Sequence, residues 1–396
     1  MADPREVWIT GIGLLSCLGE TLDAHWQQLH QPSTADTTSF APYVVHPAVK
    51  VDFDKQIPKK GDQRQMETWQ RMGVYAAGLA LDSAGLKGNA ELLSEMDMIV
   101  AAGAGERDTN VDLSILDGLR HAESREAYLN QRLLNDLRPT LFLAQLANLM
   151  AGNISIVHGV TGSSRTFMGE EAAGVDSVRV ARARIAAGQS RLSLAGAANY
   201  AERWDILLPY ALGRTLTHDQ HRRVWERPGA AGGMELGSTA AFLVLEEKQH
   251  ALDRGAKPIA RLASIESDQV RRTSGAITER LERMWSGIAA KVKPDNAAIL
   301  SGASGIAGVT EEERAFLARH PGLAVRATGT HLGHAPETQF PANIALAAAA
   351  IQHGRLYPAC DGSGMERPMD ARLRQVVVTG VGHRRGESLA LVEAVG

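Results

Sequence analysis

Glu170 and Glu171 occupy a place in the chain where enzymes often keep a nucleophile. Residues 165–168 have the character of a strand, a glycine follows, and a helical pattern covers residues 171–187. A sharp strand-to-helix turn presents one side chain at a helix N-terminus, where free backbone N–H groups favour negative charge. An enzyme would place a thiolate or an alkoxide there. Alternatively, the two glutamates only complement the helix dipole, as acids in a first turn commonly do.

Two further segments have the residue types of a site. A predicted strand at 297–300 runs into small residues that begin with Ser301, and such a loop lets a backbone approach another group closely. The second segment, 326–334, contains Gly329 and ends in His334, just before a predicted helix. A lone histidine is more often structural than catalytic, so His334 is only a candidate. By themselves, these residues provide no nucleophile–base pair.

The two cysteines do not indicate a redox or metal site. Cys17 lies in a loop after the first predicted strand and Cys360 lies far away in the chain, so they have no metal-ligand spacing. We expect two buried thiols in a reducing compartment. The sequence therefore predicts no metal and no cofactor.

Composition excludes several classes of partner. The 396 residues include 42 Lys+Arg and 45 Asp+Glu, which give a net charge of −3 without a basic run. Nucleic acids and anionic membranes are therefore not expected partners. No apolar run reaches the roughly 20 residues that a membrane span needs, and the charged start of the chain has no signal-peptide core. We expect a cytoplasmic protein.

The elements that would position the candidate residues alternate between strands and helices. Strands are predicted at 7–12, 98–102, 154–157, 165–168, 192–198, 240–245, 259–263, 297–300, 323–326, 375–378 and 389–392. Helices are predicted at 69–84, 111–134, 171–187, 246–254, 277–290, 311–319 and 342–351. This alternation predicts an α/β layered fold with buried sheets. No linker divides the chain, and the expected seam between two halves lies within residues 248–257.

Several segments, taken in order, resemble the β-ketoacyl-acyl-carrier-protein synthase family over essentially the whole chain. They are the opening strand, the first long helix, a strand and helix in the middle, and a glycine-rich turn near the C-terminus, at residues 7–16, 64–86, 242–257 and 380–386. The resemblance implies a thiolase fold, in which two related αβα halves stack into five layers. The N-terminal half would cover residues 1–250 and the C-terminal half 251–396, and the family implies an obligate dimer.

Under this resemblance, three of the four catalytic groups of the family are absent. Glu171 stands at the position of the nucleophilic cysteine, Ser301 at the first histidine and Gly329 at the lysine, while His334 matches the second histidine. Residues 170–176 also resemble the Glu-Gln-Ala-Gly-Gly-Leu-Asp signature of chain length factors, the inactive partners in type II polyketide synthases. Those proteins have glutamine where this chain has Glu171, and a carboxylate there would repel a malonyl carboxylate.

The resemblance implies a non-catalytic chain length factor that forms a heterodimer with an active ketosynthase subunit. Through that partner it would work with an acyl carrier protein, and it would close the end of the acyl tunnel with Thr109, Asp112, Leu113 and Leu116. The polar run at residues 108–110 differs from the aromatic-rich stretch of actinobacterial aromatic systems, which favours a polyene system such as aryl polyene pigment synthesis.

Two other functions remain open from the sequence. One is a stand-alone acyltransferase or malonyl decarboxylase that uses His334 with Glu171. The other is a homodimeric scaffold that binds a carrier protein or a lipid. If Glu171 is buried, its charge needs a partner, and we expect that partner to be His334 or one of three arginines, Arg271, Arg384 and Arg385.

Overall fold

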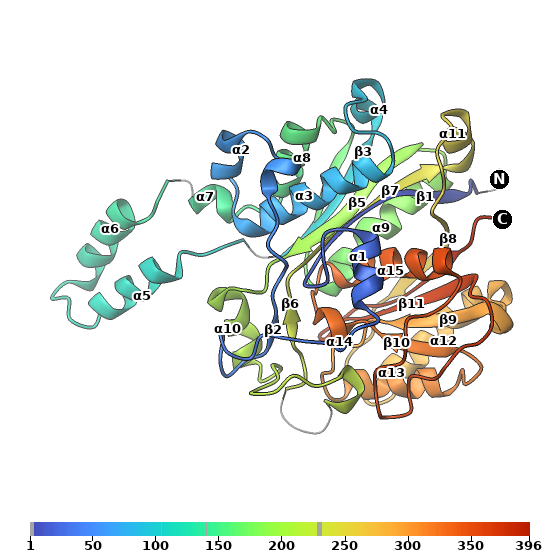
Figure 1. The fold of residues 1–396 in the computed structure, drawn as a ribbon. Helices are drawn as coiled ribbons and strands as arrows, with labels where there is room; N and C mark the ends of the chain where they lie inside the picture. The colour runs from blue at the N-terminus through green and yellow to red at the C-terminus, as the bar shows by residue number, and fades with distance from the viewer. Residues whose placement is uncertain (1–3, 104, 140, 228–231) are drawn as a thin grey trace.

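The computed structural model describes residues 4–103, 105–139, 141–227 and 232–396 (Figure 1). The strands of the large sheet are β1 (Val7–Leu15), β3 (Asp97–Ala102), β4 (Ser164–Met168), β5 (Leu192–Asn199), β7 (Thr239–Glu247), β8 (Ala260–Asp268), β9 (Ala297–Ser301), β10 (Ala324–Ala327), β11 (Gln375–Val381) and β12 (Glu387–Glu393). A separate two-stranded sheet joins β2 (Val45–His46) and β6 (Leu236–Gly237).

The helices of the first half are α1 (Leu22–Gln28), α2 (Lys60–Arg64), α3 (Thr68–Ser83), α4 (Ala90–Glu95), α5 (Thr109–Gly118), α6 (Arg125–Asp136), α7 (Leu141–Ala144), α8 (Leu149–His158), α9 (Glu171–Ala186), α10 (Trp204–Leu212) and α11 (Lys248–Asp253). Those of the second half are α12 (Ala276–Ile288), α13 (Val309–Ala318), α14 (Gly329–Leu332) and α15 (Gln339–His353).

The two halves repeat one strand order. The first half runs β4-β3-β5-β7-β1 and the second β10-β9-β11-β12-β8, so both read 3-2-4-5-1 when each set is numbered along the chain. Parallel and antiparallel pairs also fall at corresponding places. Antiparallel pairing of β1 with β8 joins the halves into one ten-stranded sheet. The duplicated α/β fold predicted from the sequence is confirmed.

The layers follow from which face of each strand is apolar. Helices α9 and α15 pack against each other between the two halves of the sheet, while α3 and α8 cover the outer face of the first half and α12 and α13 that of the second (Figure 1). In β11, Val376 and Val378 face the central core and Val377 faces the outer core, as the period of two in a strand requires. The inner strands of each half are therefore buried on both faces, whereas the edge strand β4 is largely exposed.

Two predictions for the segment between β3 and β4 are wrong. Residues 154–157, expected to be extended, belong to α8, which ends at Gly159 in the left-handed conformation (φ 77°) that commonly terminates helices. The single helix predicted over 111–134 is two helices, α5 and α6, and Gly118, with its low helix propensity, is the last residue of α5. Figure 1 shows these two helices as an arm that stands off from the sheets. Within the described ranges, no helix is long and apolar enough to cross a membrane.

Candidate functional site

The start of α9 forms the turn that the sequence predicts. Gly169, between β4 and α9, has a φ of 141°, a conformation that side-chain-bearing residues rarely adopt. Glu170 is the N-cap residue of α9 and Glu171 is its first residue. Glu171 is 5% exposed, so its carboxylate is taken out of water and needs partners inside the protein.

Two histidines supply those partners. His334 Nε2 lies 2.8 Å from Glu171 Oε1, and the backbone N–H of His383 donates to the same oxygen at 3.2 Å. The ring Nδ1 of His383 lies 3.1 Å from Glu171 Oε1 and 3.3 Å from Oε2. All three side chains are nearly inaccessible to solvent. The expected contact between Glu171 and His334 is present.

His334 is positioned by backbone bonds from the neighbouring small sheet. Gly333 before it has a φ of 68°, and a Cβ there would come within 2.9 Å of the backbone nitrogen of Gly237. The backbone N–H of His334 donates to Glu235 O at 2.7 Å, and Gly237 N–H donates to His334 O at 3.0 Å. The segment 235–237, which includes β6, therefore holds both the N–H and the carbonyl group of His334.

A buried ion pair lies directly behind this strand. Arg227 Nη2 is 3.0 Å from Glu235 Oε2, and neither side chain is accessible to solvent by more than 1%. His46 Nε2 and His221 Nδ1 contact the same oxygen at 3.0 and 2.6 Å. The guanidinium also donates to the carbonyl oxygen of Gly329 at 3.3 Å. The Arg227–Glu235 pair thus connects the segments of Arg227, Glu235 and Gly329, which surround His334.

His383 is the site residue that reasoning from the sequence missed. It lies in the turn between β11 and β12, where Gly382 N–H donates to Gly386 O at 2.8 Å. A Cβ at Gly382 would lie 2.0 Å from Arg385 O, so only glycine fits before His383. A signal was present, because residues 380–386 match the glycine-rich C-terminal turn of the resembled family and a histidine is a departure from that turn.

The arginines offered as alternatives do not pair with Glu171. Arg384 lies 3.7 Å from Glu170 Oε1, one residue away from the expected partner. Among the described contacts, neither Arg271 nor Arg385 reaches Glu171. The neutralisation of Glu171 therefore comes from imidazoles and not from guanidinium groups.

The contacts set the charge states of the site. Burial alone would raise the pKa of Glu171, but the hydrogen bonds and charges of His334 and His383 hold it well below its usual range. Burial alone would lower the pKa of His383, yet its bond to Glu171 and the charges of both glutamates raise it. Glu337 is different: burial, together with the nearby Glu171 and Glu170, raises its pKa to about 8. Glu171 is thus ionised at neutral pH, while Glu337 is protonated.

Ser301 and Gly329 lie apart from the Glu171–histidine contacts. Ser301 Oγ is buried and donates to Glu313 Oε1 at 2.7 Å, a partner outside the site. A Cβ at Gly329 would lie 3.0 Å from Ala303 O and 3.1 Å from Val224 Cγ2, so a lysine side chain there would need its neighbours to move. Of the four predicted positions, the structure brings together only Glu171 and His334.

Neither cysteine is an activated thiol. Burial raises the pKa of Cys17 to about 12, and its Sγ donates to His331 O at 3.1 Å. Burial and the charge of Glu366 raise the pKa of Cys360 to about 12 as well. Thiolates are the reactive form of cysteine, so both residues are inert at neutral pH.

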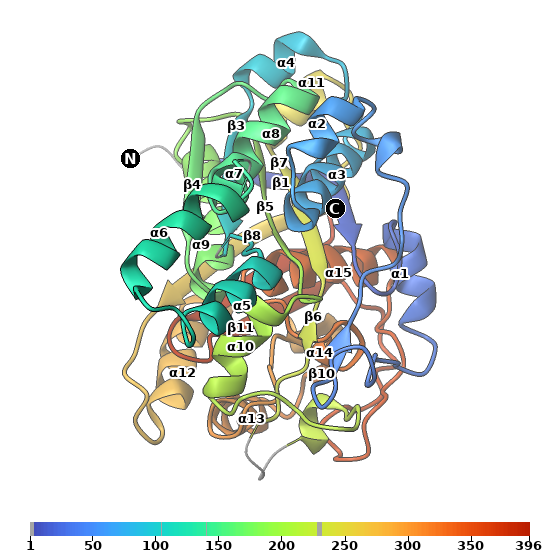
Figure 2. The ribbon, with the colours of Figure 1, turned by 90° about the vertical axis from the view of Figure 1, so that its left-hand side faces the viewer.

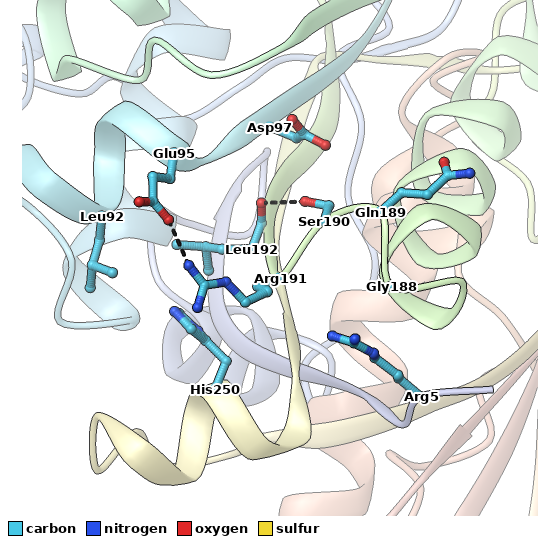
Figure 3. Close-up of a pocket in the computed structure, with 10 residues that line it drawn as sticks. All are labelled: Arg5, Leu92, Glu95, Asp97, Gly188, Gln189, Ser190, Arg191, Leu192 and His250. Carbon is cyan, nitrogen blue, oxygen red and sulfur yellow. Dashed lines mark hydrogen bonds and ion pairs between the residues drawn. The ribbon is translucent and has the colours of Figure 1, made fainter. Parts of the chain in front are cut away.

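Two cavities have different relations to the site. One of about 690 Å³ is lined by residues of α12 and α13, the loops before them and His383, and therefore reaches the Glu171 site. Another of about 370 Å³, shown in Figure 3, lies between α4, the start of β5 and α11 and shares no residue with the site. In it Arg191 pairs with Glu95 at 2.9 Å, so part of its charge is already neutralised. We take the larger cavity as the entrance to the site.

The residues expected to close a tunnel are on the arm. Thr109, Asp112, Leu113 and Leu116 all belong to α5. Leu113 and Leu116 are 65% and 60% exposed, so within this chain they line no enclosed space. Their role in a tunnel stays a prediction that depends on a partner.

The sequence of this chain is similar to those of known proteins. The family model described as "Beta-ketoacyl synthase, N-terminal domain" matches residues 4–251. The 3-oxoacyl-[acyl-carrier-protein] synthase 2 of Vibrio harveyi is 28% identical over 276 residues, which are 66% of this chain and 62% of that enzyme. The chain thus spans less than two thirds of the length of this relative.

Solved structures show the same fold over nearly the whole chain. A structure titled "The ishigamide ketosynthase/chain length factor" aligns with a TM-score of 0.79 and 20% identity, covering 99% of this chain and 100% of that one. A second, titled "AntDE:AntF (apo): type II PKS acyl-carrier protein in complex with its ketosynthase bound to the hexaketide", aligns with a TM-score of 0.74 and 18% identity at the same coverage.

Proposed function

Because the chain belongs to the β-ketoacyl synthase family, we propose that it is the non-catalytic chain length factor subunit of a ketosynthase heterodimer. One observation carries the proposal: Glu171, which we assign to the position of the nucleophile, is buried, ionised and bonded to His334 and His383. Covalent catalysis by acyl transfer needs an activated thiolate or alkoxide. A carboxylate engaged by two imidazoles offers neither an acyl acceptor of that kind nor free space beside the histidines.

The other degenerate positions support the same conclusion. Ser301 donates its hydrogen bond to Glu313, and Gly329 has no side chain and little room for one. The thiols of the chain are protonated at neutral pH. A stand-alone acyltransferase or decarboxylase would have to work with His334 and His383, while both histidines are already bonded to a carboxylate.

An exposed apolar surface supports an obligate partner. Large apolar side chains are exposed on α5, α6, α8, α10 and β4, elements seen from the side of the arm in Figure 2. They include Leu113, Leu116, Leu133, Leu134, Ile156, Met168, Trp204, Leu208 and Leu212. The last three repeat every four residues and therefore follow one side of α10. Apolar surface of this extent usually marks an interface.

The partner we propose is a cysteine-bearing ketosynthase subunit, which would accept the growing chain from an acyl carrier protein. The relatives with the same fold support this choice, since one is titled as a ketosynthase/chain length factor and another as a ketosynthase with its acyl carrier protein. In the assembly, the arm would present Leu113 and Leu116 to the partner, with Thr109 and Asp112 beside them. We extend the proposal to polyene products because the run Asp108-Thr109-Asn110 is polar.

Coexpression with a cysteine-bearing ketosynthase from the same genome tests the proposal. We expect a one-to-one heterodimer that condenses malonyl units, and loss of all condensation when the partner's cysteine is replaced by alanine. The chain expressed alone should aggregate or remain poorly soluble, because the interface of an obligate dimer buries about 2,000–5,000 Å². Turnover of a malonyl carrier protein by the purified chain alone would refute the proposal.

Tunnel closure is tested by the chain length of the product. Leu116→Trp should shorten the product made by the heterodimer, while Asp117→Trp, an exposed neighbour on α5, should leave it unchanged. Equal product lengths in both variants, measured by mass spectrometry, would remove the tunnel from the proposal and leave the heterodimer.

A further inference from the structure

Three carboxyl groups gather at the start of α9. Glu170 and Glu171 are consecutive, and their charges contribute to the raised pKa of the buried Glu337. In the described part of the chain, the guanidinium recorded against this group is that of Arg384, which lies 3.7 Å from Glu170 with a side chain 62% exposed. Glu337 is protonated at neutral pH, which leaves Glu170 and Glu171 against one guanidinium, a balance that favours binding of a cation.

His383 has one ring nitrogen without a hydrogen-bond partner. Its side chain is 4% exposed, and Nδ1 faces Glu171 while Nε2 faces Glu170 Oε1 at 3.3 Å. The geometry at Nε2 does not form a hydrogen bond, so this buried nitrogen is left unsatisfied. Buried polar atoms without a partner are uncommon in proteins, and an unoccupied ion site is one explanation.

The separations match those between the ligands of a transition-metal ion. One ligand atom from each of Glu170, Glu171 and His383 lies within 4.8 Å of the others. Zinc binds imidazole nitrogen and carboxylate oxygen at about 2.0–2.2 Å in tetrahedral geometry, which places neighbouring ligand atoms about 3.3 Å apart. His383 Nε2 and Glu170 Oε1 are 3.3 Å apart, in agreement with this value.

We propose that Glu170 Oε1 and His383 Nε2 bind a divalent transition-metal ion such as Zn²⁺, with Glu171 orienting His383 through Nδ1. A carboxylate on the second nitrogen of a ligating histidine is the usual supporting arrangement, because it fixes the tautomer and the ring orientation. His383 also lines the 690 Å³ cavity, so the proposed site lies next to that cavity.

The bound ion would tie the β11–β12 turn to the N-terminus of α9. Two effects oppose it: the positive end of the α9 dipole and Arg384, whose mostly exposed side chain can turn into solvent. The negative charges of Glu170 and Glu171 outweigh these two positive contributions. The site was not predicted from the sequence, because its ligands come from positions more than 200 residues apart that only the fold brings together.

Binding of Co²⁺ to the purified full-length chain, in the assembly in which it is soluble, tests the proposal. After removal of metals with a chelator, titration with cobalt chloride should show one equivalent bound, with visible absorption bands that Zn²⁺ abolishes. Glu170→Gln and His383→Ala should each weaken Co²⁺ binding at least about tenfold. Two controls should bind as the unchanged protein does: Glu311→Gln, an exposed acid lining the same cavity, and His218→Ala, an exposed histidine elsewhere.

Three results would each contradict the proposed metal site. The proposal is overturned if Co²⁺ does not bind, if Glu170→Gln binds it as tightly as the unchanged protein, or if the controls lose affinity equally. Glu170 is 28% exposed, so its variant should fold even if His383→Ala does not, and circular dichroism verifies this. The readout is metal affinity, so a negative result leaves the proposed heterodimer untouched, and absence of a heterodimer would leave the metal site standing.

Discussion

Replacement of Arg227 by methionine should be among the most damaging single changes in this chain. Arg227 and Glu235 are both inaccessible to solvent, and the guanidinium donates to Glu235 and to backbone carbonyls that include Gly329 O. Methionine keeps most of the volume but leaves the Glu235 carboxylate buried with three neutral or titratable partners, His46, His221 and the backbone N–H of Arg222. Removing one member of a buried ion pair costs about 3–5 kcal/mol, because the other charge loses its compensation.

The loss of stability in Arg227→Met should become smaller as the pH falls. Burial alone would raise the pKa of Glu235, but Arg227, His221 and His46 hold it well below its ordinary value of 4.5. A depressed acid pKa contributes stability that is present above the unfolded-state value and is lost as the pH falls through the folded-state value. The difference between Arg227→Met and the unchanged protein should therefore be largest near pH 7 and shrink below about pH 4.5.

Urea unfolding of the purified assembly, at one protein concentration, measures the effect. Arg223→Met is the control: it also removes an arginine, but an exposed one that pairs with Glu226 at the surface, and it should change the free energy of unfolding by less than about 0.5 kcal/mol. The double variant Arg227→Met with Glu235→Met should recover much of the loss, since replacing both partners by apolar groups is often neutral. A cost below about 1 kcal/mol for Arg227→Met, or one that is the same at pH 7 and pH 4, would refute this account of the pair.

Three further predictions concern the site and the arm. Glu171→Cys should not produce condensation by itself, because Ser301 and Gly329 leave the decarboxylation groups incomplete; an assay of carbon–carbon bond formation without a partner checks this. Leu134→Asp should weaken the heterodimer by at least tenfold in dissociation constant, whereas Asn135→Asp, an equally charged change at an exposed neighbour, should not; sedimentation distinguishes them. Glu235→Gln should make the free energy of unfolding less dependent on pH below about 4.5 than in the unchanged protein, because it removes the titrating group.

The duplicated sheet was predictable because each strand carries its own signal. Strands buried on both faces are short continuous apolar runs, and β9, β11 and β12 were found in this way near their observed places. The segment between β3 and β4 was not predicted, because its local sequence pattern does not distinguish a strand from a helix. An apolar run such as Ile154–Val157 fits a strand or a helix equally well by local pattern. Ile154 packs in the core together with residues of α3, and this packing favours the helix.

One contact of the site was also predictable from the sequence. The contact between Glu171 and His334 follows from the resemblance together with the cost of burying a charge. His383 could not be placed by such reasoning, because its role depends on the turn between β11 and β12 meeting the start of α9 across the interior. Arg384, one of the alternatives to His334 as the partner of Glu171, lies instead against Glu170.

The physical setting explains why a carboxylate is tolerated at this position. In an active member of the family, the helix N-terminus favours a thiolate, and the neighbouring imidazoles serve the reaction. The same free N–H groups and donors favour any anion, so Glu171 is ionised there with hydrogen bonds from His334 and His383. A neutral apolar replacement would have left both imidazoles buried without this acceptor, at a cost of about 1–3 kcal/mol each. Glu171 thus supplies the anion that this helix N-terminus and the two imidazoles favour, and the buried site stays fully hydrogen-bonded at Glu171.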